Sequence, residues 1–247
     1  MSTKKRHYII DSGGSGKIIV LLHGFLSSSK YWARLRPLFL FAGYRVVTID
    51  LLGFGNASKP AEVRYDYLDH VNHVNKAIND VGIKQPFILV GHSMGALIAA
   101  RYGTLHPGKV SSLVLLHPPL YSDTVETRAT LRNTSPFYRF LLDSRYRQAM
   151  WLVMRVFSFT YLGSHSQQSR ERSLKNVIEV AEVFSDLKDV HPKTLLLVGK
   201  KDRKEYLNNL PKFQLSQSVS VAIENVTHHS PRLQPLLVKD RIVEFVS

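Results

Sequence analysis

One pentapeptide of this sequence has the residue types of a catalytic nucleophile turn. Gly91-His92-Ser93-Met94-Gly95 follows the aliphatic run Phe87–Val90 and precedes an alanine-rich stretch with helical character. A serine at such a strand-to-helix turn is held in a strained backbone conformation that exposes its hydroxyl above the sheet. Gly91 and Gly95 fit this turn because side chains there would collide where strand and helix close on each other. We therefore expect Ser93 to be a nucleophile.

Two backbone N–H groups are candidates for an oxyanion hole. Met94 would open the helix after the nucleophile, so its N–H and the helix dipole point to where an oxyanion develops. His23-Gly24-Phe25 follows an earlier aliphatic run, and in a parallel sheet its loop lies at the same carboxyl edge as Ser93. Gly24 lets the backbone turn so that the Phe25 N–H faces the site. We expect His23 to brace this loop and His92 to pack against the sheet.

An acid and a histidine follow the nucleophile in the chain order of a hydrolase triad. Asp202 stands three residues after Gly199, and His228-His229-Ser230-Pro231 precedes a closing helical stretch. The order Ser93, Asp202, His229 is that of Ser…Asp…His hydrolases. The imidazole of His229 would take the Ser93 proton, while the carboxylate fixes its tautomer and stabilises the imidazolium.

Two other aspartates, Asp50 and Asp123, also stand after expected strands. Asp50 also follows an expected strand, but it precedes the nucleophile in the chain, so we expect it to fix a loop through backbone N–H groups. Asp123 follows the strand after the nucleophile and is the alternative acid.

The elements that must position these residues are short β-branched runs alternating with helical patterns. This alternation predicts an α/β fold with a doubly wound, mostly parallel sheet whose strands are buried on both faces. The expected strands are Lys17–His23, Arg45–Asp50, Phe87–His92, Ser111–His117, Thr194–Gly199 and Ser218–Ile223. The expected helices are Lys30–Ala42, Tyr67–Val81, Met94–His106 and Leu233–Val246.

The strand pattern stops between His117 and Pro192, where the sequence is helical in character and rich in aromatic residues. A block of this size between two strands predicts a helical cap inserted over one end of the sheet. The expected organisation is a hydrolase core in residues 1–117 and 192–247, with the cap insertion in residues 118–191. Two ordinary crossover helices are the alternative for this block.

Together these residues resemble the α/β-hydrolase fold superfamily. The resemblance covers nearly the whole chain and is carried by His23-Gly24-Phe25, Asp50 with Gly53, Gly55 and Ser58, Gly91–Gly95, Asp202, and His229-Ser230-Pro231. It implies a serine hydrolase with a helical cap, similar to carboxylesterases, lipases, thioesterases and carbon–carbon bond hydrolases. Members that open epoxides or displace halide use an aspartate at this turn, so the serine implies acyl chemistry.

Two features depart from that family. Its catalytic histidine commonly stands in a Gly-His-x-Pro context, whereas His228 precedes His229 here. Because Pro231 lies two residues beyond His229, we favour His229 over His228. The family usually has two strands before the His-Gly strand, and this sequence has room for one, near Tyr8–Asp11.

Composition limits the remaining possibilities. The 247 residues include no cysteine, which excludes a disulfide framework, a thiolate zinc site and a cysteine nucleophile. The net charge of +14 attracts anions without sequence preference, and no nucleic-acid motif accompanies it, so we expect no specific nucleic-acid partner. No apolar run approaches the roughly 20 residues of a membrane span, and no secretory signal opens the chain, so we expect a soluble, cytoplasmic protein.

We therefore expect an enzyme that cleaves ester or thioester bonds of small apolar or aromatic molecules through an acyl-enzyme. No cofactor and no metal are expected. A carbon–carbon bond hydrolase acting on diketone-type acids with the same three residues is the first alternative. A non-catalytic ligand-binding protein of the same fold is the second.

Overall fold

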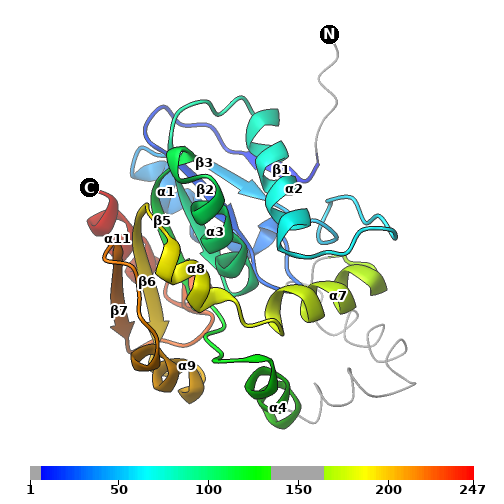
Figure 1. Ribbon diagram of the computed structural model, residues 1–247. Helices are drawn as coiled ribbons and strands as arrows, with labels where there is room; N and C mark the ends of the chain where they lie inside the picture. The colour runs from blue at the N-terminus through cyan, green and yellow to red at the C-terminus, as the bar shows by residue number, and fades with distance from the viewer. Residues whose placement is uncertain (1–6, 135–163) are drawn as a thin grey trace.

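The computed structural model describes residues 7–134 and 164–247, and its centre is a seven-stranded sheet (Figure 1). The strand order is β1-β3-β2-β4-β5-β6-β7. The strands are β1 Ile9–Asp11, β2 Ile18–Leu22, β3 Arg45–Ile49, β4 Phe87–His92, β5 Val110–Leu116, β6 Lys193–Gly199 and β7 Val219–Glu224. β1 runs antiparallel to β3 at one edge, and every other pair is parallel. This confirms the expected α/β class, and β1 is the one strand that residues 7–17 form before β2.

The register of the central strands brings their carboxyl ends to one edge. Val20 pairs with Leu89, and Leu89 pairs with Leu113. In the same way Leu22 pairs with Gly91 and Gly91 with Leu115. The loops that follow β2, β4 and β5 therefore begin side by side, which is where open α/β sheets bind their ligands.

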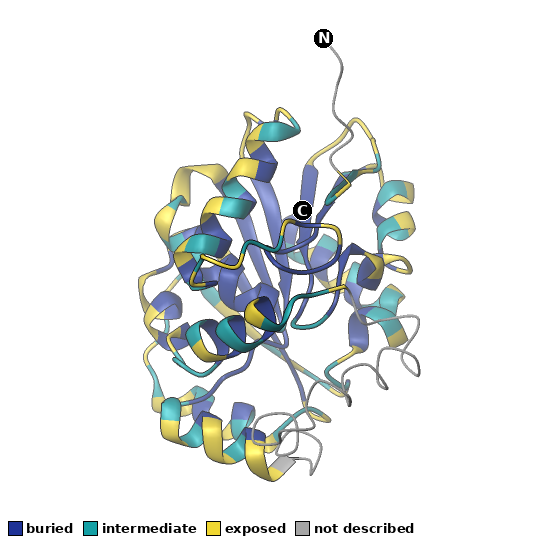
Figure 2. Ribbon diagram, turned by 90° about the vertical axis from the view of Figure 1, so that its right-hand side faces the viewer, coloured by how far each residue is buried: buried dark blue, intermediate teal, exposed yellow. Residues whose placement is uncertain are grey.

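Two separate apolar clusters cover the two faces of the sheet. Alternate strand residues such as Val20 and Leu89 belong to one cluster, while Ile19 and Ile88 belong to the other, as the two-residue period of a strand requires. Figure 2 shows the resulting buried sheet between helices with exposed outer faces. The first cluster packs under α2 Tyr67–Asp80, α3 Met94–Leu105 and α8 Val183–Asp189; the second packs under α1 Arg36–Phe41 and α11 Pro235–Val246.

Prolines divide two of the expected helices. The stretch expected as one helix over Lys30–Ala42 forms a 3-10 turn, η1 Ser29–Trp32, and then the short α1 with Pro37 in its first turn. The closing helix begins earlier than expected, as α10 Ser230–Leu233, and resumes at Pro235 as α11. Proline lacks an N–H and clashes with the preceding turn, so it favours the start of a helix.

Short connecting elements complete the core. They are η2 Pro107–Lys109, between α3 and β5, and α9 Lys204–Asn209 with η4 Leu210–Lys212, between β6 and β7.

The segment expected as a cap is described in part. It contains α4 Thr124–Thr134, α7 Gln167–Ser173 and the π-helical turn η3 Leu174–Ile178. Its aromatic-rich stretch, residues 137–161, lies outside the described residues. α8, within the same segment, packs on α3: Arg101 Nε donates to Asp186 at 2.5 Å and its Nη2 to Glu182 at 2.6 Å. The expected cap range thus includes a helix that covers the sheet.

Within residues 7–134 and 164–247, no helix combines the length and the apolar character needed to cross a membrane.

Candidate active site

The turn between β4 and α3 holds Ser93 in a strained conformation. Its φ of 54° and ψ of −122° lie outside the regions that residues with a side chain favour. The Ser93 N–H donates to the Leu116 carbonyl at 2.9 Å, which ties the turn to β5. A Cβ on Gly91 would meet the Gly95 carbonyl, and a Cβ on Gly95 would meet the His23 carbonyl. Only glycine at both positions allows this close approach.

The loop after β2 lies against the nucleophile turn. A Cβ on Gly24 would lie 3.0 Å from the Ser93 Cβ. The fully buried His23 places Nδ1 2.8 Å from the Gly24 carbonyl, and its Nε2 accepts the Leu51 N–H at 3.0 Å. The proton is therefore on Nδ1, and burial lowers the pKa of His23, which keeps the ring neutral. His23 braces the loop that presents Phe25.

Asp50 and Asp123, the alternative acid, both have structural roles. Asp50 Oδ1 accepts the Ser29 N–H at 2.5 Å, and Oδ2 accepts the Asn56 N–H at 2.8 Å. Its expected role in fixing a loop is confirmed. Asp123 accepts the Glu126 N–H at 2.8 Å, so it satisfies a backbone donor in the first turn of α4.

Asp202, just after β6, pairs with a histidine, and that histidine is His228. His228 Nδ1 lies 2.7 Å from Asp202 Oδ2, while Asp202 Oδ1 accepts the Arg203 N–H at 2.8 Å. The Asp202 side chain is only 4% exposed, against 28% for His228. The expectation that His229 makes this contact is corrected, since the structure brings the neighbouring imidazole to the acid.

The start of α10 explains the correction. The helix begins at Ser230, so His229 is its N-cap and is exposed to solvent. His228 lies one residue further back, in the loop after β7. Its carbonyl lies 2.8 Å from His92 Nε2, which holds the loop against the nucleophile turn. A proline in the first turn is typical of a helix start, and Pro231 was the signal that could have placed α10 correctly.

Burial and hydrogen bonding set the charges of the pair. Burial alone raises the pKa of the Asp202 carboxyl, but the hydrogen bond and charge of His228 and the Arg203 N–H outweigh it, and the net shift is downward. Burial lowers the pKa of His92 well below 6.5. Near neutral pH the site therefore contains an ionised Asp202 and a neutral His92.

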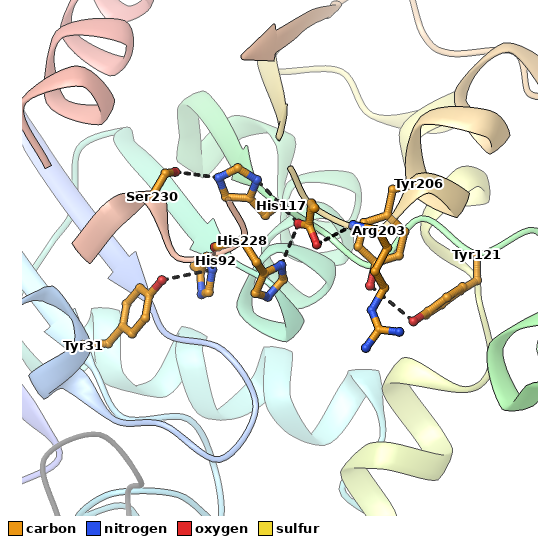
Figure 3. A network of polar contacts seen from close by, with 9 residues as sticks. Tyr31, His92, His117, Tyr121, Arg203, Tyr206, His228 and Ser230 are labelled. Carbon is orange, nitrogen blue, oxygen red and sulfur yellow. Dashed lines mark hydrogen bonds and ion pairs between the residues drawn. The ribbon is translucent and has the colours of Figure 1, made fainter. Parts of the chain in front are cut away.

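A second buried histidine, His117, approaches Asp202, and Figure 3 shows it next to Ser230. His117 Nδ1 lies 3.8 Å from Asp202 Oδ2, and its Nε2 lies 2.7 Å from Ser230 Oγ. Burial lowers the pKa of His117 to about 4, so this ring is neutral at pH 7. The sequence alone does not place His117 at Asp202, because only the fold brings the end of β5 beside the loop after β6.

A cavity of about 380 Å³ opens at these residues. Ser93, Asp202, His228 and His229 line it together with Arg203. The other described residues around it are apolar or aromatic: Phe25, Leu26, Pro119, Tyr121, Leu131, Leu174, Ile178 and Tyr206. The sequence residues expected at the site, Ser93 and Asp202, thus meet at one cavity with both adjacent histidines.

A second hollow, of about 260 Å³, shares Ser93 with the first. Tyr31, His92 and Arg232 contribute to its wall. The Tyr31 ring stacks on His92 with centroids 4.5 Å apart, and its hydroxyl lies 3.1 Å from His92 Nε2. Ser93 therefore stands between two hollows, one with an aliphatic wall and one with a polar wall.

Relatives with matching segments have several activities in their names. A segment of this chain is 38% identical over 108 positions to "Probable lysophospholipase BODYGUARD 1" from Arabidopsis thaliana. The match covers 42% of this chain and 23% of that protein. They are 36% identical over 116 positions to "Epoxide hydrolase B" from Mycobacterium tuberculosis, 46% of this chain and 32% of that protein. The matches thus span about a quarter to a third of these relatives.

Solved structures match over nearly the full length. The esterase EaEST from Exiguobacterium antarcticum superposes with a TM-score of 0.75 at 21% identity, covering 97% of this chain and 94% of the esterase. At this identity the likeness shows the fold alone. The family model described as "alpha/beta hydrolase fold" matches residues 17–238. With that match, the strand order and the turn at Ser93, this chain belongs to the α/β-hydrolase fold family.

Proposed function

We propose that this protein is a serine hydrolase that cleaves carboxylic ester or thioester bonds, with Ser93 as nucleophile, His228 as general base and Asp202 as the acid that orients it. The observation that carries the proposal is the 2.7 Å contact between His228 Nδ1 and Asp202 Oδ2 at the cavity lined by Ser93. With Nδ1 bound to the carboxylate, Nε2 is the nitrogen left to take the serine proton.

The proposed reaction has two halves. The Ser93 hydroxyl gives its proton to His228 Nε2 as its oxygen attacks the carbonyl carbon of the ester. The Phe25 and Met94 N–H groups stabilise the oxyanion, each by about 3–4 kcal/mol in the transition state. His228 then protonates the departing alcohol and leaves an acyl-enzyme. Water, deprotonated by His228, cleaves that ester, releases the carboxylic acid and restores Ser93.

A serine nucleophile favours acyl chemistry over the epoxide chemistry named for one relative. Attack by an aspartate on an epoxide or a halide carbon gives an ester, which water can cleave at its carbonyl. Attack by Ser93 on the same carbon would give an ether, which has no carbonyl and would not turn over. The proposal therefore confines turnover to substrates that carry an acyl group.

The cavity limits the size and polarity of the substrate. About 380 Å³ is near the lower end of small-molecule pockets. Leu131, Leu174 and Ile178 contribute an aliphatic wall at the cap side. We infer that the acyl or alcohol group of the substrate is apolar over several carbons.

Hydrolysis of p-nitrophenyl esters of two to ten acyl carbons tests the proposal. Wild type should turn over the shorter members, and Ser93→Ala should reduce kcat by roughly 10⁴-fold or more. Equal rates for both proteins would disprove the role of Ser93. Turnover of diketone-type acids without turnover of any ester would favour the carbon–carbon hydrolase instead. Binding of esters without any turnover would favour a ligand-binding protein.

A further inference from the structure

We propose that a second copy of this chain pairs with the edge strand β7, antiparallel and around a two-fold axis at Val221, so that the two seven-stranded sheets join into one. The inference concerns a surface away from the proposed active site. Among the described residues that line the cavity at Ser93, none belongs to β7. Failure of either proposal therefore leaves the other standing.

The outer side of β7 carries backbone groups that can pair with another strand. Figure 1 shows β7 at the left edge of the sheet, with β6 as its neighbour. The Glu224 carbonyl accepts the Lys200 N–H at 2.7 Å, so the backbone of Glu224 faces the β6 side. Because alternate residues of a strand bond to the same neighbour, the backbone of Val221 and Ile223 faces outward. In the part of the chain that the structure describes, no strand pairs with this side.

The side chains of β7 do not protect this edge. Val221 is 42% exposed and Ile223 is 48% exposed. From Val219 to Ile223 the strand contains no charged residue and no proline, although these are the usual devices that keep an edge strand from pairing. A β-branched strand with an open edge therefore favours the addition of another strand.

One register makes β7 complementary to itself. With Val221 on the two-fold axis, the two Val221 residues exchange N–H···O=C bonds, and each Ile223 N–H donates to the carbonyl of the partner's Val219. The N–H of Val219 is already used, since it donates to the Ser216 carbonyl at 3.0 Å. Side chains directly opposite each other share one face, so Val219, Val221 and Ile223 of both copies form one apolar row. A closed two-fold pair is also the commonest form of assembly.

Opposite charges meet in the same register. Glu224 of one copy lies opposite Ser218 of the other, and Lys193 of β6 stands beside Ser218, one residue before the first β6–β7 pair. Both charged side chains lie on the face that α11 covers: Glu224 contacts Arg241 at 2.8 Å, and Lys193 Nζ lies 4.5 Å from the Phe245 ring centroid.

The spacing of strands allows these charges to interact. Neighbouring strands lie about 4.8 Å apart, so Glu224 and the partner's Lys193, two strands apart, have Cα atoms about 10 Å apart. Two long side chains bridge this distance over the small Ser218, and the symmetry repeats the contact. The edge thus carries charges that are complementary to a second copy of itself.

Sedimentation velocity measures the association of the full chain. A single pair of edge strands buries less surface than a standard interface, so we expect a dissociation constant of roughly 1–100 μM. The sedimentation coefficient of wild type should therefore rise from the value of a monomer toward that of a dimer as the protein concentration increases to about 300 μM. Wild type that stays monomeric over this range would overturn the inference.

Substitutions at Val221 assign the association to β7. Val221→Lys places a charge on the axis, and Val221→Pro removes an outward N–H while the bonds to β6 remain. Both should be monomeric at the concentrations where wild type associates. Leu68→Lys, the same charge added at a 56% exposed leucine of α2, should associate like wild type. Far-UV circular dichroism shows which variants are folded, and a folded Val221 variant that associates like wild type would overturn the inference.

Single cysteines report the register, because the chain contains none of its own. On the axis the two Val221 Cα atoms would lie about 5.5 Å apart, which a disulfide can span. Val221→Cys should therefore form a disulfide-linked dimer with oxidised glutathione. Ser220 opposes the partner's Ala222, so two Ser220 Cα atoms would lie about 7–8 Å apart on a diagonal, and Ser220→Cys should cross-link at least tenfold more slowly. Equal rates, or faster linkage in Ser220→Cys, would overturn the inference.

An exchange of charges tests the contact between Glu224 and the partner's Lys193. Glu224→Lys and Lys193→Glu should each raise the dissociation constant about tenfold, since the symmetry doubles each repulsion. The two substitutions together should restore a value near that of wild type. A double variant that associates no more tightly than either single variant would show that this register is wrong.

Discussion

The middle of the sheet and its carboxyl edge differ in side-chain chemistry and in backbone conformation. In the middle, aliphatic residues such as Val20 and Leu196 are fully buried in extended strands. At the edge, three of the five described non-glycine residues with positive φ follow β2, β4 and β5, namely Leu26, Ser93 and His117. Buried histidines gather at the same edge. The apolar middle of the sheet thus offsets the strain and the buried polar groups that the site requires.

Substitution of Ser93 should produce the largest effect and separate activity from strain. Ser93→Ala and Ser93→Gly should both lower ester hydrolysis by roughly 10⁴-fold. Glycine tolerates the φ of 54°, so Ser93→Gly should be more stable than Ser93→Ala by about 1 kcal/mol. Urea unfolding measures the difference. A Gly variant no more stable than the Ala variant would show that the turn is not strained.

Substitution in the middle of the sheet should lower the stability of the protein and leave the activity of the folded protein nearly unchanged. Leu113 is fully buried in β5 and pairs with Leu89 in the middle of the sheet, so Leu113→Ala should lower the free energy of unfolding by about 3 kcal/mol. At temperatures where the variant stays folded, kcat should change by less than about threefold. A loss of kcat near that of Ser93→Ala in folded protein would contradict the separation of the two regions.

Buried histidines away from the triad should make stability depend on pH. Burial lowers the pKa of His70 from 6.5 to about 3, while its Nε2 lies 3.1 Å from Ser173 Oγ. Between these values the unfolded chain binds the proton and the folded protein does not. The contribution of His70 is therefore complete above pH 6.5 and is lost as the pH falls toward 3.

Urea unfolding of His70→Gln at several pH values checks this effect. Below pH 6.5, the slope of unfolding free energy against pH should be smaller in the variant by up to about 1.4 kcal/mol per unit. Identical slopes in both proteins would mean that His70 is not buried in its neutral form. Because His23 and His92 are also shifted downward by burial, some acid sensitivity should remain.

The local patterns predicted most of the fold and the nucleophile turn. Each of the six predicted strands lies within two residues of an observed one. Strands buried on both faces, such as Ile18–Leu22, are continuous aliphatic runs, whereas the edge strand β7 is partly exposed. The helix break near Pro37 was missed, since periodicity alone does not weigh the cost of a proline in a turn.

The choice between adjacent histidines could not be made from local pattern. A shift of one residue in the loop after β7 decides whether His228 or His229 faces Asp202. That shift depends on where α10 begins and on the His92 contact with the His228 carbonyl. The His92 contact joins segments 136 residues apart in the sequence, so no local pattern could show it.

Covalent labelling with a fluorophosphonate tests the central assignment most directly, because the probe reacts with a serine that a nearby base activates. Mass spectrometry should find the adduct on Ser93 in wild type. His229→Ala should be labelled at a rate within a few fold of wild type, and His228→Ala at least 10²-fold more slowly. An adduct on another residue, or slow labelling in His229→Ala with normal labelling in His228→Ala, would contradict the pairing of His228 with Asp202 as the catalytic arrangement.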